Sequence, residues 1–176
     1  MKRGFTLIEL MVIAVVVVIL AIVTIPRLMT IGEVRLHMAV RKVAQDLRYA
    51  HEYAVINNLD TKVSFNNTAN TYTVFSRSGS GPWEVIEDPS TGENFAVQLN
   101  TGEYKGVTIG TIDFDGQSEV AFDTMGIPHE PDDPMEWIGT VNLKAGLGAG
   151  ARTSSVFVDP DTGRVYLQGY YYYSFP

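Results

Sequence analysis

The chain contains no cysteine among its 176 residues. Disulfide bonds, thiol catalysis and cysteine-ligated metal centres are therefore excluded. Basic residues are also few, because 13 lysines and arginines stand against 20 aspartates and glutamates, which gives a formal net charge of -7. General binding of nucleic acid is disfavoured by this balance, since neutralising phosphates requires clustered cations.

Catalytic motifs are missing as well. The three histidines, His37, His51 and His129, are scattered and belong to no Ser-His-Asp or H-E-x-x-H pattern. The glycine-rich segment 146–150 lacks the Gly-Lys-Ser/Thr of a phosphate-binding loop and precedes an expected strand where such a loop would precede a helix. We therefore expect neither enzymatic activity nor a cofactor.

A long apolar run opens the chain. From Phe5 to Ile25 the sole charged residue is Glu9, and about 20 apolar helical residues suffice to cross a hydrocarbon layer of about 30 Å. Lys2 and Arg3 precede this run, and basic residues beside a first hydrophobic segment tend to remain cytoplasmic. We predict that residues 5–26 span a membrane, with the C-terminal domain outside the cytoplasm.

Two residues within this segment are unusual for a membrane helix. The carboxylate of Glu9 would cost about 2.5 to 3.5 kcal/mol to insert at the centre of a membrane helix, so such a group usually has a partner or a function. The alternative is that Glu9 has no special role and lies near the membrane interface, where a charge costs little. Pro26 removes one helical hydrogen bond and crowds the preceding turn, so we expect a kink there, or the point where the helix leaves the membrane.

The N-terminal sequence Gly4-Phe5-Thr6-Leu7-Ile8-Glu9 resembles the class III signal of type IV prepilins and type II secretion pseudopilins. The resemblance implies that a prepilin peptidase removes residues 1–4, cutting between Gly4 and Phe5, and methylates the new amino group of Phe5. Glu9 would pair with the amino group of Phe5 on a neighbouring subunit. Implied partners are other pilin or pseudopilin subunits and an inner-membrane assembly platform; the implied locations are the bacterial inner membrane and then a periplasmic pseudopilus or a cell-surface pilus.

The helical pattern continues beyond the membrane segment. Apolar residues recur at steps of three and four through residues 27–57, at Leu36, Val40, Val43, Leu47, Ala50 and Ala54. This spacing predicts one long helix from Phe5 to about Asn57, with an amphipathic second half that covers a sheet.

From residue 58 to residue 176 the period changes to two, and turn signals separate short strands. We expect strands at Lys62–Phe65, Thr71–Phe75, Trp83–Ile86, Phe95–Leu99, Val107–Ile112, Glu119–Phe122, Trp137–Leu143, Ser155–Val158 and Val165–Tyr172. The last two form a hairpin around Asp159–Gly163. One helix followed by many antiparallel strands is an α+β arrangement.

Three segments, Arg48–Asn58, Phe122–Pro128 and Val156–Val165, are similar in order to the globular pattern of the GspH/FimT group of minor pilins and pseudopilins. The resemblance implies a pilin-like fold, in which a long N-terminal helix packs on an antiparallel sheet. It also implies a structural subunit of a type IV pilus or a type II secretion pseudopilus.

One alternative function is a DNA-binding minor pilin for natural transformation, which would need clustered cations. After Lys105 the basic residues are Lys144, Arg152 and Arg164 alone, so we favour the structural interpretation.

Two further features allow alternatives. Asp113 and Asp115, together with the segment His129–Asp133, could supply oxygen ligands to calcium, although without the EF-hand spacing a solvated acidic loop is favoured. The tail Tyr170–Tyr173 fits an edge strand or an aromatic contact patch.

Overall fold

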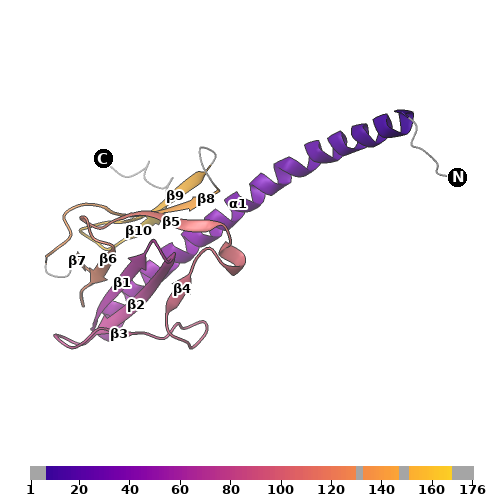
Figure 1. Cartoon of the computed structure of the whole chain (residues 1–176). Helices are drawn as coiled ribbons and strands as arrows, with labels where there is room; N and C mark the ends of the chain where they lie inside the picture. Colours follow the sequence, from indigo (N-terminus) through magenta and orange to yellow (C-terminus); the bar gives the residue numbers. More distant parts are fainter. Residues whose placement is uncertain (1–6, 130–132, 147–150, 168–176) are drawn as a thin grey trace.

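The computed structural model describes residues 7–129, 133–146 and 151–167, apart from the side chains of residues 21–30. One helix, α1 (Leu7–Asn57), dominates its shape. Its second half packs on a β-rich domain, and its first half projects away from that domain (Figure 1). The structure therefore has a long shaft with strands gathered around one end.

The second half of α1 is helical and buried for the reason that the sequence pattern predicts. Its inward face is made of the apolar residues at three- and four-residue steps, and these are almost fully inaccessible: Leu36, Ala39, Val40, Val43, Ala44, Leu47, Ala50 and Ala54. The helix ends at Asn57, and Asn58 takes the left-handed conformation (φ 54°) that asparagine tolerates after a helix C-terminus. The amide of Leu59 then donates to the carbonyl of Ala54 at 3.1 Å.

Two antiparallel sheets cover this half of α1. The first sheet has the order β3-β2-β1-β6-β7, with β4 also paired to β2. Its strands are β1 (Asp60–Asn66), β2 (Thr71–Arg77), β3 (Glu84–Val85), β4 (Ala96–Gln98), β6 (Glu119–Phe122) and β7 (Pro128–His129). The second sheet has the order β10-β9-β8-β5, with strands β5 (Val107–Asp113), β8 (Gly139–Ala145), β9 (Arg152–Val158) and β10 (Val165–Leu167). A short 3-10 helix, η1 (Gly102–Tyr104), precedes β5.

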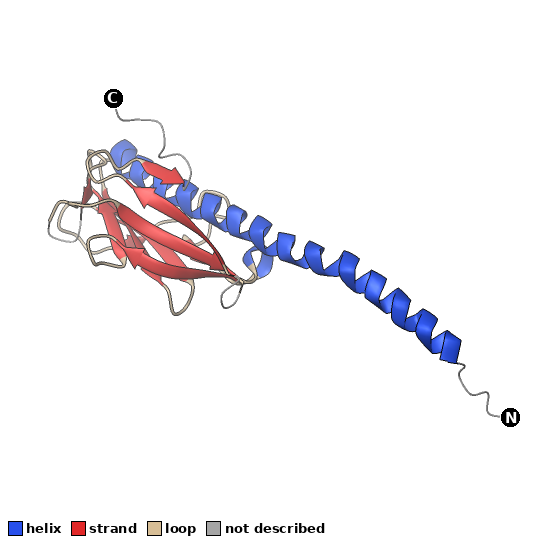
Figure 2. Cartoon of the chain, turned by 90° about the horizontal axis from the view of Figure 1, so that it is seen from above, coloured by secondary structure: helices blue, strands red, loops and turns tan. Residues whose placement is uncertain are grey.

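The core lies between α1 and the two sheets (Figure 2). In β1 and β8 the residues alternate between buried and partly or fully exposed positions, as expected for strands with one face on a core. Hydrogen bonds also tie the layers together. Thr61 Oγ1 donates to the carbonyl of Ala50 at 2.8 Å, and Arg48 Nη2 donates to the carbonyl of Val165 at 2.8 Å.

The strands of the second sheet run alongside α1. The first residue of β9, Arg152, is paired with Glu33 through an Nε to Oε1 distance of 3.0 Å. The last residue of β9, Val158, faces Val165, whose carbonyl binds Arg48. Since both ends of β9 meet α1 about four turns apart, the two elements are nearly parallel.

The expected α+β layout is confirmed, and the hairpin of β9 and β10 forms as predicted. Several strand limits differ from the prediction by one to three residues; β9, for example, begins at Arg152 and not at Ser155. Strand β8 begins at Gly139, so Trp137 precedes it, and β7 is a two-residue strand that the sequence did not predict. The predicted final strand is present at Val165–Leu167; its remainder, residues 168–172, lies outside the described residues.

Candidate assembly surface

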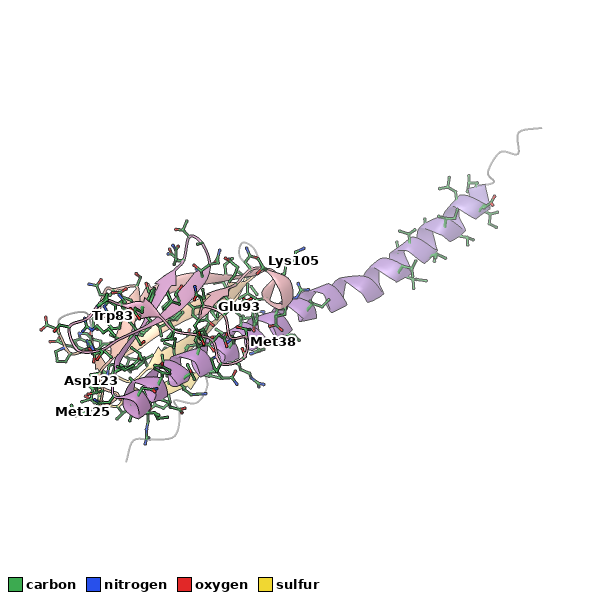
Figure 3. The ribbon with its side chains drawn as sticks, turned by 90° about the horizontal axis from the view of Figure 1, so that it is seen from below. Met38, Trp83, Glu93, Lys105, Asp123 and Met125 are labelled. Atoms are coloured by element: carbon green, nitrogen blue, oxygen red, sulfur yellow. The ribbon has the colours of Figure 1, made fainter. Side chains whose placement is uncertain are left out.

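The projecting half of α1 is a continuous apolar surface. Among residues 7–20 every large apolar side chain is exposed, from 48% at Val16 to 80% at Leu7. The side chains project all around the isolated helix (Figure 3). A soluble protein rarely leaves so large an apolar surface in water, so this half of α1 requires a covering of lipid or protein.

Glu9 is the sole charged residue within Leu7–Leu20, and it lies in the first turn of α1. A carboxylate is favoured at this position, because the amide groups of a helix N-terminus carry partial positive charge. Gly4 and Phe5, the predicted cleavage and methylation site, lie outside the described residues. The pairing of Glu9 with Phe5 of another subunit stays a prediction.

Within the part of the chain that is described, no helical segment combines the length and the apolar character needed to cross a bilayer. The predicted span, residues 5–26, includes residues 5 and 6 and the side chains of residues 21–26, all outside the description. Helix α1 continues without interruption past Pro26 and curves along its length (Figure 2). A specific kink at Pro26 stays a prediction.

Apolar side chains of α1 are also exposed where the helix meets the domain. An open hollow of about 320 Å³ lies there, lined by Ile31, Val34, Arg35, Met38 and Glu103. Arg35 Nη1 donates to the carbonyl of Lys105 at 3.1 Å, which holds the end of η1 against the helix. Met38 and Lys105 accordingly lie beside the base of the projecting helix (Figure 3).

All three pilin-like segments meet at the other end of α1, where Gly126 and Gly163 lie over His51. Gly126 and Gly163 both have positive φ, 82° and 65°. A Cβ atom at Gly126 would lie 2.5 Å from His51 Nε2, and one at Gly163 would lie 2.6 Å from His51 Cδ2 and 2.4 Å from the carbonyl oxygen of Gly126. The His51 ring also stands edge-on to Phe122, with ring centroids 5.5 Å apart. Close packing of these segments on His51 therefore holds the end of α1 against both sheets. We interpret the glycines as structural residues.

A polar network is buried beneath the half of α1 that packs on the domain. Asp46 is only 5% exposed and accepts hydrogen bonds from Lys42 Nζ at 2.8 Å and from the hydroxyl of Tyr72 at 2.5 Å. Burial raises the pKa of Asp46, and it outweighs the lowering effects of Lys42 and Tyr72. The pKa of Tyr72 is raised well above its usual value, first by burial and then by Asp46.

The raised pKa of Asp46 makes a prediction about stability. An acid whose pKa is higher in the folded state stabilises the fold below its unfolded value, 3.8, and this contribution is lost as pH rises through the folded value. Asparagine mimics the protonated acid. We expect Asp46→Asn to gain stability relative to the wild type as pH rises above about 4. Urea unfolding of both proteins at several pH values measures this, and a pH-independent difference would contradict it.

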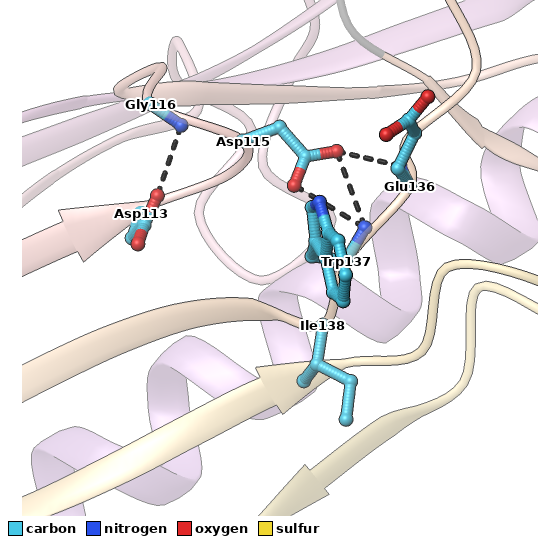
Figure 4. Close-up of a pocket in the computed structure, with 6 residues that line it drawn as sticks. All are labelled: Asp113, Asp115, Gly116, Glu136, Trp137 and Ile138. Atoms are coloured by element: carbon cyan, nitrogen blue, oxygen red, sulfur yellow. Dashed lines mark hydrogen bonds between the residues drawn. The ribbon is translucent and has the colours of Figure 1, made fainter.

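A second hollow, of about 420 Å³, opens at the end of β5 (Figure 4). It is lined by Asp113, Asp115, Gly116, Glu136, Trp137 and Ile138. The carboxylate of Asp115 accepts the amide hydrogens of Glu136 at 2.6 Å and of Trp137 at 3.2 Å, and Asp113 accepts that of Gly116 at 2.9 Å. Both aspartates therefore fix loop backbone.

The calcium alternative involved these aspartates and the segment His129–Asp133. Residues 130–132 of that segment lie outside the described part. In the ranges that are described, no three His, Cys, Asp or Glu side chains gather as metal ligands do. The carboxylates of Asp113 and Asp115 accept hydrogen bonds from loop backbone amides, which fits a solvated acidic turn.

The basic residues of the DNA-binding alternative are divided between the two ends of the second sheet. Lys144 and Arg152 are at one end, since Lys144 faces Thr153 across the β8–β9 pair, whereas Arg164 directly precedes Val165, which faces Val158 at the other end. The tail Tyr170–Tyr173 lies outside the described residues, as does most of the glycine-rich segment 146–150.

Sequence reasoning did not single out Asp46 or Trp137. The position of Asp46 three residues after Val43, on the apolar face of α1, is a signal that could have identified a buried acid. The sequence pattern predicts Trp137 at the start of a strand, whereas β8 begins at Gly139 and leaves Trp137 in the loop that lines the acidic hollow.

No protein-family model matches the sequence, and no curated protein matches it. Two solved structures of the minor pseudopilin EpsH, from the type II secretion system of Vibrio cholerae, are similar in three dimensions, with TM-scores of 0.55 and 0.56. Their sequence identities are 12% and 11%; each match covers 76% of this chain, and 95% and 92% of the EpsH chains. The type IV minor pilin FimU of Pseudomonas aeruginosa matches with 14% identity and a TM-score of 0.49, over 76% of this chain and 87% of that chain. The chain therefore has the pilin-like fold that its sequence predicts, with a long helix packed on antiparallel sheets as in the minor pseudopilin EpsH.

Proposed function

We propose that this protein is a structural subunit of a type IV pilus or a type II secretion pseudopilus, assembled through α1. The observation that carries the proposal is the projecting half of α1, whose large apolar side chains are all exposed between Leu7 and Leu20. A helix of this kind is covered by lipid before assembly and by the helices of other subunits afterwards.

The pilin-like fold supports the same proposal. Its β-rich domain sits at one end of α1, so a bundle of such helices would carry the domains on its outside (Figure 1). The chain has a formal net charge of -7, and all of its acidic residues except Glu9 lie beyond residue 32, which suits a domain that stays in water. In this proposal the protein acts by assembling into a filament and catalyses no reaction; the chemical steps are those by which the peptidase processes it.

That processing forms the finer part of the proposal. Prepilin peptidase cleaves between Gly4 and Phe5 and methylates Phe5, and the subunit waits in the inner membrane for its assembly platform. Glu9 then neutralises the amino group of Phe5 on an adjacent subunit. A charge within a bundle of apolar helices is costly unless it is compensated, so this pairing would favour the assembled state.

Photo-cross-linking from the projecting helix tests the assembly route. A benzophenone amino acid at Val16, which is 48% exposed, would react with whatever covers this side of α1. We expect covalent adducts with pilin or pseudopilin subunits, identified by mass spectrometry of the adduct bands. In matched cells without prepilin peptidase these adducts should disappear. Adducts with lipid alone, in both kinds of cell, would contradict the proposal.

A further inference from the structure

The second sheet has a basic end and an acidic end. Its register sets the two ends: Val107 faces Ala145, which faces Arg152, whereas Asp113 faces Thr140 at the opposite limit of the strands. We call the first the near end, because the pair of Arg152 with Glu33 places it beside the base of the projecting helix. The other is the far end. Seven-residue strands separate them by about 20 Å.

Three exposed cations have their backbone positions at the near end: Lys105, which precedes β5, Lys144 near the end of β8, and Arg152 at the start of β9. The side chain of Lys144 extends over Gly110 of β5, where an added Cβ would lie 2.7 Å from Lys144 Cε. Arg152 is 71% exposed even though its Nε meets Glu33. Among the described residues, Glu33 pairs with Arg152 and Glu103 lies two residues before Lys105, so three cations stand against two acids there in a chain that is acidic overall.

The far end is acidic with an apolar centre. Its carboxylates come from the last residue of β5, Asp113, and from the loops that join the strands, Asp115, Glu136, Asp159 and Asp161; among the described residues of this end they stand against one cation, Arg164. Trp137 is 72% exposed in the middle of the hollow (Figure 4). Ile138 adjoins it and is 46% exposed. Because its amide hydrogen is held by Asp115, the backbone of Trp137 is fixed on this surface.

We propose that these two ends are the halves of one contact, in which the near end of one copy docks on the far end of the next. The inference rests on the proposed function, because it describes how neighbouring subunits would meet outside the helix bundle. The lysines and arginine would face the carboxylates and lie over the Trp137 ring, an arrangement that complementary charge and cation–π attraction both favour.

A second copy of this chain is the occupant for a geometric reason. The two ends point in opposite directions along the same strands, so they cannot meet within one molecule. A contact between unlike surfaces of identical molecules is heterologous, and it either closes into a ring or continues as a filament. An exposed aromatic residue ringed by charge also matches the usual anatomy of a protein interface, which has an apolar centre and a polar rim.

The absence of cysteine permits a direct test in the full-length chain. Cysteine replaces Thr153, beside the near-end cations, and Ile138, at the far end, in one double variant expressed where filaments form. After treatment with a short bis-maleimide, we expect a ladder of dimers, trimers and larger species on a denaturing gel. Each single variant, Thr153→Cys or Ile138→Cys, can reach only dimers and serves as the matched control.

Charge reversal in the double-cysteine protein tests the chemistry of the contact. We expect Lys144→Glu or Glu136→Lys to reduce the trimers and larger species about tenfold. The two reversals together should restore most of the ladder. A ladder that ignores both single reversals would overturn the inference.

The outcomes also separate this inference from the proposed function. If the double-cysteine chain is present in sheared filaments yet yields nothing larger than a dimer, the head-to-tail contact is wrong and the filament role stands. If the chain is absent from filaments and yields no ladder, both are wrong.

Discussion

Replacement of Gly163 by alanine is expected to destabilise the domain by about 3 kcal/mol, the sum of a strained backbone and an overpacked site. Gly163 has a φ of 65°, which costs an L-residue energy by itself. The added Cβ would lie 2.4 Å from the carbonyl oxygen of Gly126, which is backbone and cannot move alone. Urea unfolding of the full-length protein in detergent, followed by tryptophan fluorescence, measures the loss.

Gly92→Ala is the matched control. Gly92 has a similar φ, 73°, and a Cβ there would meet nothing within 4 Å. This variant incurs the backbone cost alone, and we expect a loss of about 1 kcal/mol. Equal losses in the two variants would show that the junction of Gly126, Gly163 and His51 is less tightly packed than the structure has it.

Replacement of Glu9 by alanine is expected to lower the amount of this chain in filaments at least tenfold, to about one tenth or less. Without the carboxylate, the positive amino group of Phe5 on the adjacent subunit would enter the helix bundle uncompensated. The quantity of the chain in sheared filaments, relative to its quantity in the membrane, measures the effect. Glu9→Ala subunits that enter filaments at the normal yield would contradict the pairing.

Glu52→Ala provides the control for that experiment. Glu52 is an exposed acid of α1, on the half of the helix that lies in the domain. Its removal changes the net charge as Glu9→Ala does and leaves the projecting half unaltered. If the Glu52→Ala variant enters filaments normally and the Glu9→Ala variant does not, the loss is due to the position of Glu9 in the projecting half of α1. A general effect of removing one negative charge would lower both variants.

The elements that the sequence predicted well are those with a local cause. The apolar steps from Leu36 to Ala54 define one face of a helix by themselves, and the structure buries that face. The hairpin around Asp159–Gly163 depends on a turn within a few residues, and it forms as predicted. Periodicity and turn chemistry therefore suffice for the layout of α1 and for most strands.

The features that the sequence did not predict arise from contacts between distant segments. Strand β7 has two residues and exists because His129 pairs with Ala121. The acidic hollow forms because Asp115 captures the backbone of Glu136 and Trp137, about twenty residues later. The buried pair of Asp46 and Tyr72 joins residues 26 positions apart. No window of sequence holds both partners of such a contact, so pattern reasoning alone does not find them.

The separation of charge along the second sheet follows the same logic. Lys105, Lys144 and Arg152 are spread over 48 positions of the sequence, so the sequence alone does not indicate that they lie at the same end of a sheet. Antiparallel pairing brings the ends of β8 and β9 together, and Lys105 joins them because it precedes β5. The basic end is therefore a property of the sheet topology.

If this chain is processed as a prepilin and packed into a filament, its mature N-terminus can be recovered from filament preparations. Filaments sheared from the cell surface, or a pseudopilus purified from the envelope, are digested and searched by mass spectrometry for the peptide that begins at N-methylated Phe5. We expect this peptide to be present, in quantity if the subunit is abundant and as a trace beside another pilin if it is minor. Chains that all retain residues 1–4 and never leave the membrane would contradict it.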